Sequence, residues 1–176
     1  ELEPSFYGFS DADLETVFNT SNTFFGKDTM SLRDLLNALR ETYCGTIGVE
    51  YMYTTDQNQK RWWQQKLESI RSKPNFSADK KHQILDRLTA AEGLERFLHT
   101  KYVGQKRFSL EGGESFIAAM DELIQQAGAK GIQEIVIGMA HRGRLNVLVN
   151  TLGKMPGDLF AEFDHTAPEE LPAGDV

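Results

Sequence analysis

The feature that most constrains the fold is a short apolar run, Ile132 to Ala140, with the β-branched residues Ile135, Val136 and Ile137 at its centre. Runs of this length and composition are typical of strands buried on both faces, which occur in parallel sheets. Such a strand needs neighbouring strands and covering helices, but the chain shows only one convincing strand. We therefore expect either the incomplete opening of a parallel α/β sheet that other chain completes, or a segment that packs differently in isolation.

The first hundred residues carry helical rather than strand periodicity. Ser31 is a good N-cap, and the four leucines after it (Leu32, Leu35, Leu36 and Leu39) share one helical face. Ser77 caps a longer helical stretch whose inner face includes Ala91, Leu94 and Leu98. These patterns predict a mainly helical part over residues 1–105, followed by the start of an α/β domain over residues 106–176.

Shorter elements are expected around this frame. A short helix is predicted near Asp11 to Phe18, and the Gly-rich turn Glu111–Ser115 leads into a helix that ends at Gly128. Helices are also predicted from Leu145 to Leu152 and from about Pro156 to Phe163. The fold class is therefore α+β to α/β.

Charge is distributed in blocks along the chain. Residues 1–59 hold 3 basic and 10 acidic side chains, residues 60–107 hold 12 and 5, and residues 108–176 hold 4 and 11. A basic block can bind phosphates or nucleic acid. Because Lys and Arg alternate with Glu and Asp at helical spacing here, a solvated helical face is the favoured interpretation, with no nucleic-acid partner.

Several functions have little support in the sequence. No apolar run approaches the ~18 to 20 residues of a membrane span, so no membrane role is expected. Cys44, the single cysteine, is predicted to be a buried, inert thiol. His82, His99 and His165 form no ligand cluster, and no metal site is predicted.

The strongest candidate site follows the predicted strand. His141, Arg142 and Arg144 lie between that strand and a helix start, which suits an anionic ligand such as a carboxylate or phosphate. His141 can also donate a proton or hydrogen bond to a developing oxyanion. The alternative is that Arg142 and Arg144 pair with acidic residues on adjoining helices. The Glu111–Glu114 turn is a weaker candidate, because its two carboxylates repel anions.

Four blocks in the chain resemble the thiamine-diphosphate-dependent decarboxylating component of 2-oxoglutarate dehydrogenase. They are TYCGTIGVEYM at Thr42–Met52, AAEGLERFL at Ala90–Leu98, KRFSLEGGE at Lys106–Glu114 and GMAHRGRLNVL at Gly138–Leu148. They follow the order of the family over residues 42–154. Thr46 stands where the family commonly has Pro, at a turn and not in the active site.

The resemblance implies an oxidoreductase that is a homodimer, with thiamine diphosphate and Mg²⁺ at the interface. It decarboxylates 2-oxoglutarate and passes the succinyl group to a lipoyl domain of the dihydrolipoyl succinyltransferase component. His141 matches the family histidine that faces the 2-oxo-acid, and Arg142 matches an arginine at the cofactor. A bacterial cytoplasm or a mitochondrial matrix is the expected location.

The resemblance also implies that other functional residues lie elsewhere. The family's Gly-Asp…Asn segment for Mg²⁺ and the glutamate that activates the cofactor are not found in this sequence. The chain is therefore expected to be an inactive fragment of a larger enzyme. A related 2-oxoadipate dehydrogenase, a 2-oxoglutarate decarboxylase and a non-enzymatic helical partner-binding module are the alternatives.

Overall fold

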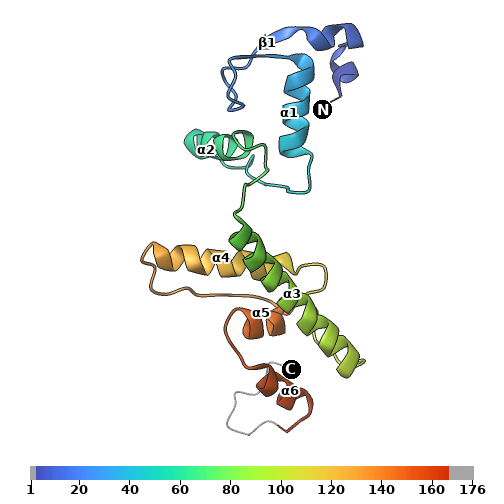
Figure 1. The fold of residues 1–176 in the computed structure, drawn as a ribbon, viewed down its shortest axis with the longest axis vertical. Helices are drawn as coiled ribbons and strands as arrows, with labels where there is room; N and C mark the ends of the chain where they lie inside the picture. Colours follow the sequence, from blue (N-terminus) through green and yellow to red (C-terminus); the bar gives the residue numbers. More distant parts are fainter. Residues whose placement is uncertain (1–2, 167–176) are drawn as a thin grey trace. The chain divides into compact units, whose positions relative to one another are not determined.

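The computed structural model describes residues 3–166 and divides the chain into two compact units, Glu1–Asn75 and Phe76–Val176 (Figure 1). The sequence predicts a different boundary, between residues 105 and 106, where an α/β domain would begin. That boundary stays a prediction. The predicted mainly helical character is confirmed, because most of the regular elements are helices.

The first unit combines short elements with two longer helices. Its elements are the 3-10 helices η1 (Pro4–Tyr7) and η2 (Asp11–Glu15), the strands β1 (Val17–Asn19) and β2 (Thr29–Ser31), and the helices α1 (Leu32–Tyr43) and α2 (Gln57–Glu68). The strands pair antiparallel, with Phe18 opposite Met30. The helix predicted from Asp11 to Phe18 is wrong after Glu15, because Val17–Asn19 instead pairs with β2.

Helix α1 begins where the sequence predicts. The hydroxyl of Ser31 accepts a hydrogen bond from the backbone N–H of Asp34 at 3.1 Å, which satisfies one of the free donors of the first turn. The helix ends at Tyr43, and Cys44 after it is exposed. The prediction of a buried thiol is therefore wrong, because the chain leaves the packed face of α1 at this point.

A buried carboxylate holds the first unit together. Glu68, at the end of α2, accepts hydrogen bonds from the Tyr43 hydroxyl at 2.8 Å and from the Phe24 backbone N–H at 2.7 Å. Burial, together with the neighbouring Tyr51 and Glu68, raises the pKa of Tyr43 above its usual value. The phenol therefore remains a neutral donor to Glu68 at any physiological pH.

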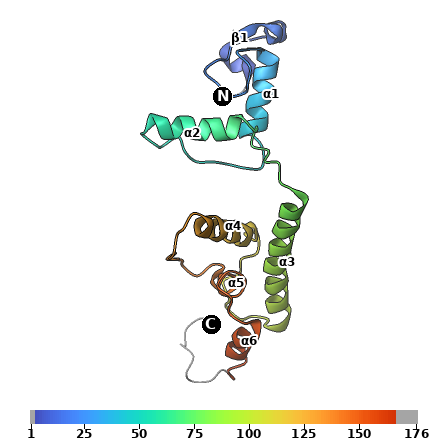
Figure 2. The same cartoon turned by 60° about the vertical axis from the view of Figure 1, so that its left-hand side comes forward.

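The second unit is built on one long helix. It contains α3 (Ala78–Lys101), α4 (Ser115–Ala129), α5 (Arg144–Asn150) and α6 (Pro156–Phe163). Helices α4, α5 and α6 follow one another beside α3, and α4 runs across the direction of α3 (Figures 1 and 2). Two clusters of buried side chains join these helices. One consists of Leu94, Leu98, Tyr102, Leu145, Leu159 and Phe163, and the other of Ala91, Leu110, Ile117 and Val147.

The cap of α3 offers a simple test of the second unit. The Ser77 hydroxyl accepts from the Lys80 N–H at 3.2 Å. Ser77→Ala is expected to lower the free energy of unfolding by about 1 kcal/mol, because it leaves this donor without its acceptor. Urea unfolding measures the change, and Ser77→Asp, which keeps an acceptor, is the matched control. Equal losses in both variants would show that the cap does not stabilise α3.

The predicted buried strand is not found among residues 3–166. Residues 132–140 form an irregular connection between α4 and α5, and the side chain of Val136 is 96% exposed. A strand needs a hydrogen-bonded neighbour, and the one sheet in the described part of the chain pairs β1 with β2 in the other unit. The prediction of a strand at this run is therefore wrong for the described residues. The parallel α/β domain that other chain would complete stays a prediction.

Most of the cations in the basic block, residues 60–107, form ion pairs. Its cations with carboxylate partners include Arg71, Lys73, Lys80, Arg87, Arg96, Lys101 and Arg107. This pairing supports the interpretation of a solvated helical face. Between residues 3 and 166, no helix has both the length and the apolar composition that crossing a bilayer requires.

Candidate functional site

His141 and Arg142 lie side by side on an exposed turn that leads into α5. The turn is closed by a hydrogen bond from the Arg144 N–H to the His141 carbonyl at 3.1 Å. Helix α5 has seven residues and ends at Asn150, so it is shorter than the predicted helix to Leu152. Because His141 and Arg142 precede α5, contacts outside this helix hold their side chains in place.

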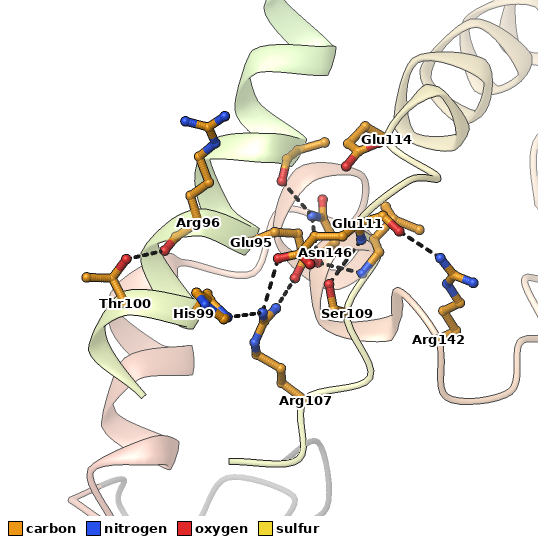
Figure 3. Close-up of polar contacts among 12 residues, drawn as sticks. Glu95, Arg96, His99, Thr100, Arg107, Ser109, Glu111, Glu114, Arg142 and Asn146 are labelled. Carbon is orange, nitrogen blue, oxygen red and sulfur yellow. Dashed lines mark hydrogen bonds and ion pairs between the residues drawn. The ribbon is translucent and has the colours of Figure 1, made fainter. Parts of the chain in front are cut away.

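Those contacts come from one segment, Arg107–Glu111, which lies between α3 and α4. The Gly143 N–H donates to the Phe108 carbonyl at 2.8 Å, and the Phe108 ring lies against the His141 ring with centroids 4.7 Å apart. The Arg142 guanidinium donates to the Glu111 carbonyl at 2.7 Å (Figure 3). The segment thus contacts three consecutive residues of the turn.

Glycine is required at position 143 for two reasons. Its φ of 77° lies in the left-handed region, which side chains with a Cβ rarely adopt. A Cβ built there would also lie 2.6 Å from Cδ1 of Leu110, which is closer than real Cβ contacts come. The backbone of the turn is therefore pressed against the same segment that carries Phe108.

A buried carboxylate, Glu95 on α3, holds this segment in turn. The Glu95 side chain is ion-paired with Arg107 and accepts from the Leu110 N–H at 3.0 Å. It also accepts from Nδ2 of Asn146 on α5 at 3.1 Å, and Asn146 donates as well to the Ala91 carbonyl at 2.9 Å (Figure 3). Glu95 is 3% exposed and Asn146 is fully buried. A charge buried this deeply costs free energy unless it is paired and hydrogen-bonded, as it is here.

Arg107 extends the network toward the turn. Its second terminal nitrogen lies 3.3 Å from the Glu111 carboxylate and 3.4 Å from Nδ1 of His99. Glu111 in turn accepts from Arg142 through its backbone carbonyl. A continuous set of contacts therefore runs from Glu95 through Arg107 and Glu111 to Arg142.

The Gly112–Gly113 stretch is a turn into α4, as the sequence predicts. Gly112 has a φ of 83°, and its N–H donates to the Glu114 carboxylate at 2.9 Å. Hydrogen bonds from the backbone N–H groups of Glu114 and Gly112, with the nearby charge of Arg142, lower the pKa of Glu114. The chain's own carboxylate thus accepts the Gly112 donor that a phosphate would have used.

The other histidines named from the sequence, His82, His99 and His165, do not gather at this turn. Of the other histidines, His99 contacts Arg107, and no group of three or more His, Cys, Asp or Glu side chains suited to a metal ion occurs within residues 3–166. Sequence analysis missed Glu95, Arg107 and Asn146. A signal for Glu95 was present, because it lies four residues after Ala91, on the predicted apolar face of α3.

Comparison with known proteins gives consistent matches. The chain is 78% identical over all 176 residues to a 2-oxoglutarate dehydrogenase E1 component from Cupriavidus necator, and covers 18% of that protein. It is 53% identical to the E1 component of Azotobacter vinelandii over 176 residues, covering 19% of it. With that of Haemophilus influenzae the identity is 48% over 163 residues, or 93% of this chain and 17% of the relative. No protein-family model matches the chain.

The family resemblance is therefore confirmed. At this level of identity over its length, the chain matches one segment of thiamine-diphosphate-dependent E1 components. The chain belongs to the family of 2-oxoglutarate dehydrogenase E1 components. It spans less than a fifth of the length of these relatives.

Proposed function

We propose that this chain is the part of a 2-oxoglutarate dehydrogenase E1 enzyme that contributes the His141–Arg142 turn to the active site. The observation that carries the proposal is the 78% identity over all 176 residues to a protein of that name. The geometry supports it, because the two side chains are adjacent, exposed and held from behind by one buried network. The proposed α/β domain then includes residues contributed by the rest of the enzyme.

Each residue of the turn has a distinct proposed role. The His141 imidazole binds the carboxylate or the 2-oxo oxygen of the substrate, as donor of a hydrogen bond or proton. The Arg142 guanidinium carries five N–H donors, and one of them binds the Glu111 carbonyl. It is exposed and fits an anionic group such as a diphosphate.

The cofactors of the proposed enzyme are thiamine diphosphate and Mg²⁺. Bound thiamine diphosphate supplies the electron sink for loss of the carboxylate as carbon dioxide. We assign the Mg²⁺ ligands to the family's Gly-Asp…Asn segment and not to this chain. Activity is accordingly proposed for the whole enzyme, and the chain by itself is not expected to catalyse the reaction.

The partners proposed for the whole enzyme follow from the family. They are a second copy of the enzyme in a homodimer, and the lipoyl domain of a dihydrolipoyl succinyltransferase component that receives the succinyl group. The three relatives come from bacteria, which favours a bacterial cytoplasm over a mitochondrial matrix. Their shared name favours 2-oxoglutarate over 2-oxoadipate as the substrate.

The test is steady-state turnover by the whole enzyme that contains this segment. We expect 2-oxoglutarate decarboxylation to require both thiamine diphosphate and Mg²⁺, and mass spectrometry to detect a succinylated lipoyl domain. 2-Oxoadipate carries one more methylene, so its kcat/KM should be lower by roughly 10- to 200-fold. Turnover without thiamine diphosphate, or a higher kcat/KM for 2-oxoadipate, would contradict the proposal.

A further inference from the structure

Behind the His141–Arg142 turn lies the buried ion pair of Glu95 and Arg107. The Glu95 carboxylate also accepts hydrogen bonds from two further groups. Glu95 binds three partners from two parts of the second unit: Arg107 and the Leu110 N–H of the segment Arg107–Glu111, and Asn146 of α5. Two of these partners flank Phe108 in sequence, one residue before it and two residues after it. The carboxylate thus holds the Arg107 side chain just before Phe108 and the Leu110 backbone N–H just after it.

The backbone at Phe108 is strained. Its φ of 48° lies in the left-handed region, which is unfavourable for a bulky residue and persists only where the surroundings enforce it. Phe108 is also half exposed, so burial of its own ring does not explain the conformation. The anchors on Arg107 and Leu110 supply the constraint. In this conformation the Phe108 carbonyl meets the Gly143 N–H, and the ring meets His141.

The same anchors reach Arg142 by a second route. Arg107, paired with Glu95, also contacts the carboxylate of Glu111, whose carbonyl accepts from Arg142. His141 is therefore linked to Glu95 through the segment that carries Phe108, and Arg142 is linked to it through Glu111 and Arg107. A separate anchor, Asn146, fixes the helix that follows the turn.

The geometry points to Glu95 as a positioning residue of the decarboxylation reaction: its carboxylate sets the places of His141 and Arg142 through the segment Arg107–Glu111. This inference rests on the proposed function. Glu95 itself touches neither substrate nor cofactor in this scheme. A displacement of about 1 Å at a reacting group can cost roughly 100-fold in rate, so loss of this support should be measurable in turnover.

The test uses the whole enzyme and compares two buried ion pairs of the same unit. Glu95→Gln removes the charge that holds Arg107. Glu162→Gln removes the corresponding charge of the Lys154–Glu162 pair, which links α6 to the chain before it. The side chains of Lys154 and Glu162 are 18% and 15% exposed, so both pairs are well shielded. Both substitutions should lower the thermal midpoint.

Their effects on turnover should differ. Glu95→Gln is expected to lower kcat/KM for 2-oxoglutarate by roughly 10- to 100-fold and to weaken thiamine diphosphate binding, whereas Glu162→Gln should leave kcat/KM within about twofold of the parent. Equal losses of kcat/KM in the two variants would show that general destabilisation, and not positioning, is responsible.

A double substitution covers the case in which Glu95→Gln folds poorly. Adding Arg107→Met removes the buried cation that Glu95→Gln leaves with only the exposed Glu111 carboxylate as a partner, so the thermal midpoint should recover. Turnover should stay low, because the segment Arg107–Glu111 still lacks its anchor. Recovery of kcat/KM together with stability would overturn the inference. A parent enzyme without thiamine-diphosphate-dependent turnover would overturn the proposed function, and this inference with it. An active parent with an unaffected Glu95→Gln variant would overturn the inference alone.

Discussion

Replacing His141 with alanine in the complete enzyme is expected to lower kcat/KM for 2-oxoglutarate by roughly 10- to 1000-fold, or about 1.4 to 4 kcal/mol of transition-state stabilisation. The imidazole is exposed at the turn and lies against the Phe108 ring, so it is accessible to a ligand. A donor aimed at an oxygen that gains charge is worth most in the transition state. Affinity for thiamine diphosphate should change little, because the proposed contact is to the substrate.

Arg142→Ala is the matched comparison, because it alters the neighbouring side chain of the same turn. Unlike His141→Ala, it should weaken thiamine diphosphate binding more than it alters substrate discrimination. Steady-state kinetics and cofactor titrations on both variants separate the two roles. An unchanged kcat/KM in the His141 variant would falsify its substrate role and leave the imidazole as a packing partner of Phe108.

The helical elements of the chain could be predicted from local signals. Ser31 and Ser77 mark the starts of α1 and α3, and the leucine spacing after each gives the packed face. Pro156 marks the start of α6 at the residue where the helix begins. Such signals are local, because a cap or a helical period involves residues within one or two turns.

Residues 132–140 show why the remaining structure could not be predicted in this way. Their β-branched composition fits a strand, but strand formation depends on a partner that the run does not itself encode. The candidate site was found only in part for the same reason. His141 and Arg142 are adjacent in sequence, whereas Glu95 reaches Asn146 across 51 residues. A charge on an apolar helical face predicts that a partner exists, but not which one.

The second large effect is expected at Gly143 and concerns stability. Gly143→Ala should lower the free energy of unfolding by about 2 to 5 kcal/mol, as the sum of left-handed backbone strain and overpacking. The added Cβ would lie 2.6 Å from Cδ1 of Leu110 and 3.4 Å from its Cγ. Leu110 is buried beside Ile117 and Val147, so it has little room to move away. Urea unfolding followed by circular dichroism measures the loss.

Gly153→Ala separates the two contributions. Gly153 has a φ of 79°, close to that of Gly143, but a Cβ there meets no atom within 4 Å. It should therefore show only the conformational cost, about 1 to 2 kcal/mol. The difference between the two variants measures the contact with Leu110. If the two losses are equal, the turn can move away from Leu110 without cost, and the close approach of Gly143 to the segment that carries Phe108 does not fix the position of His141.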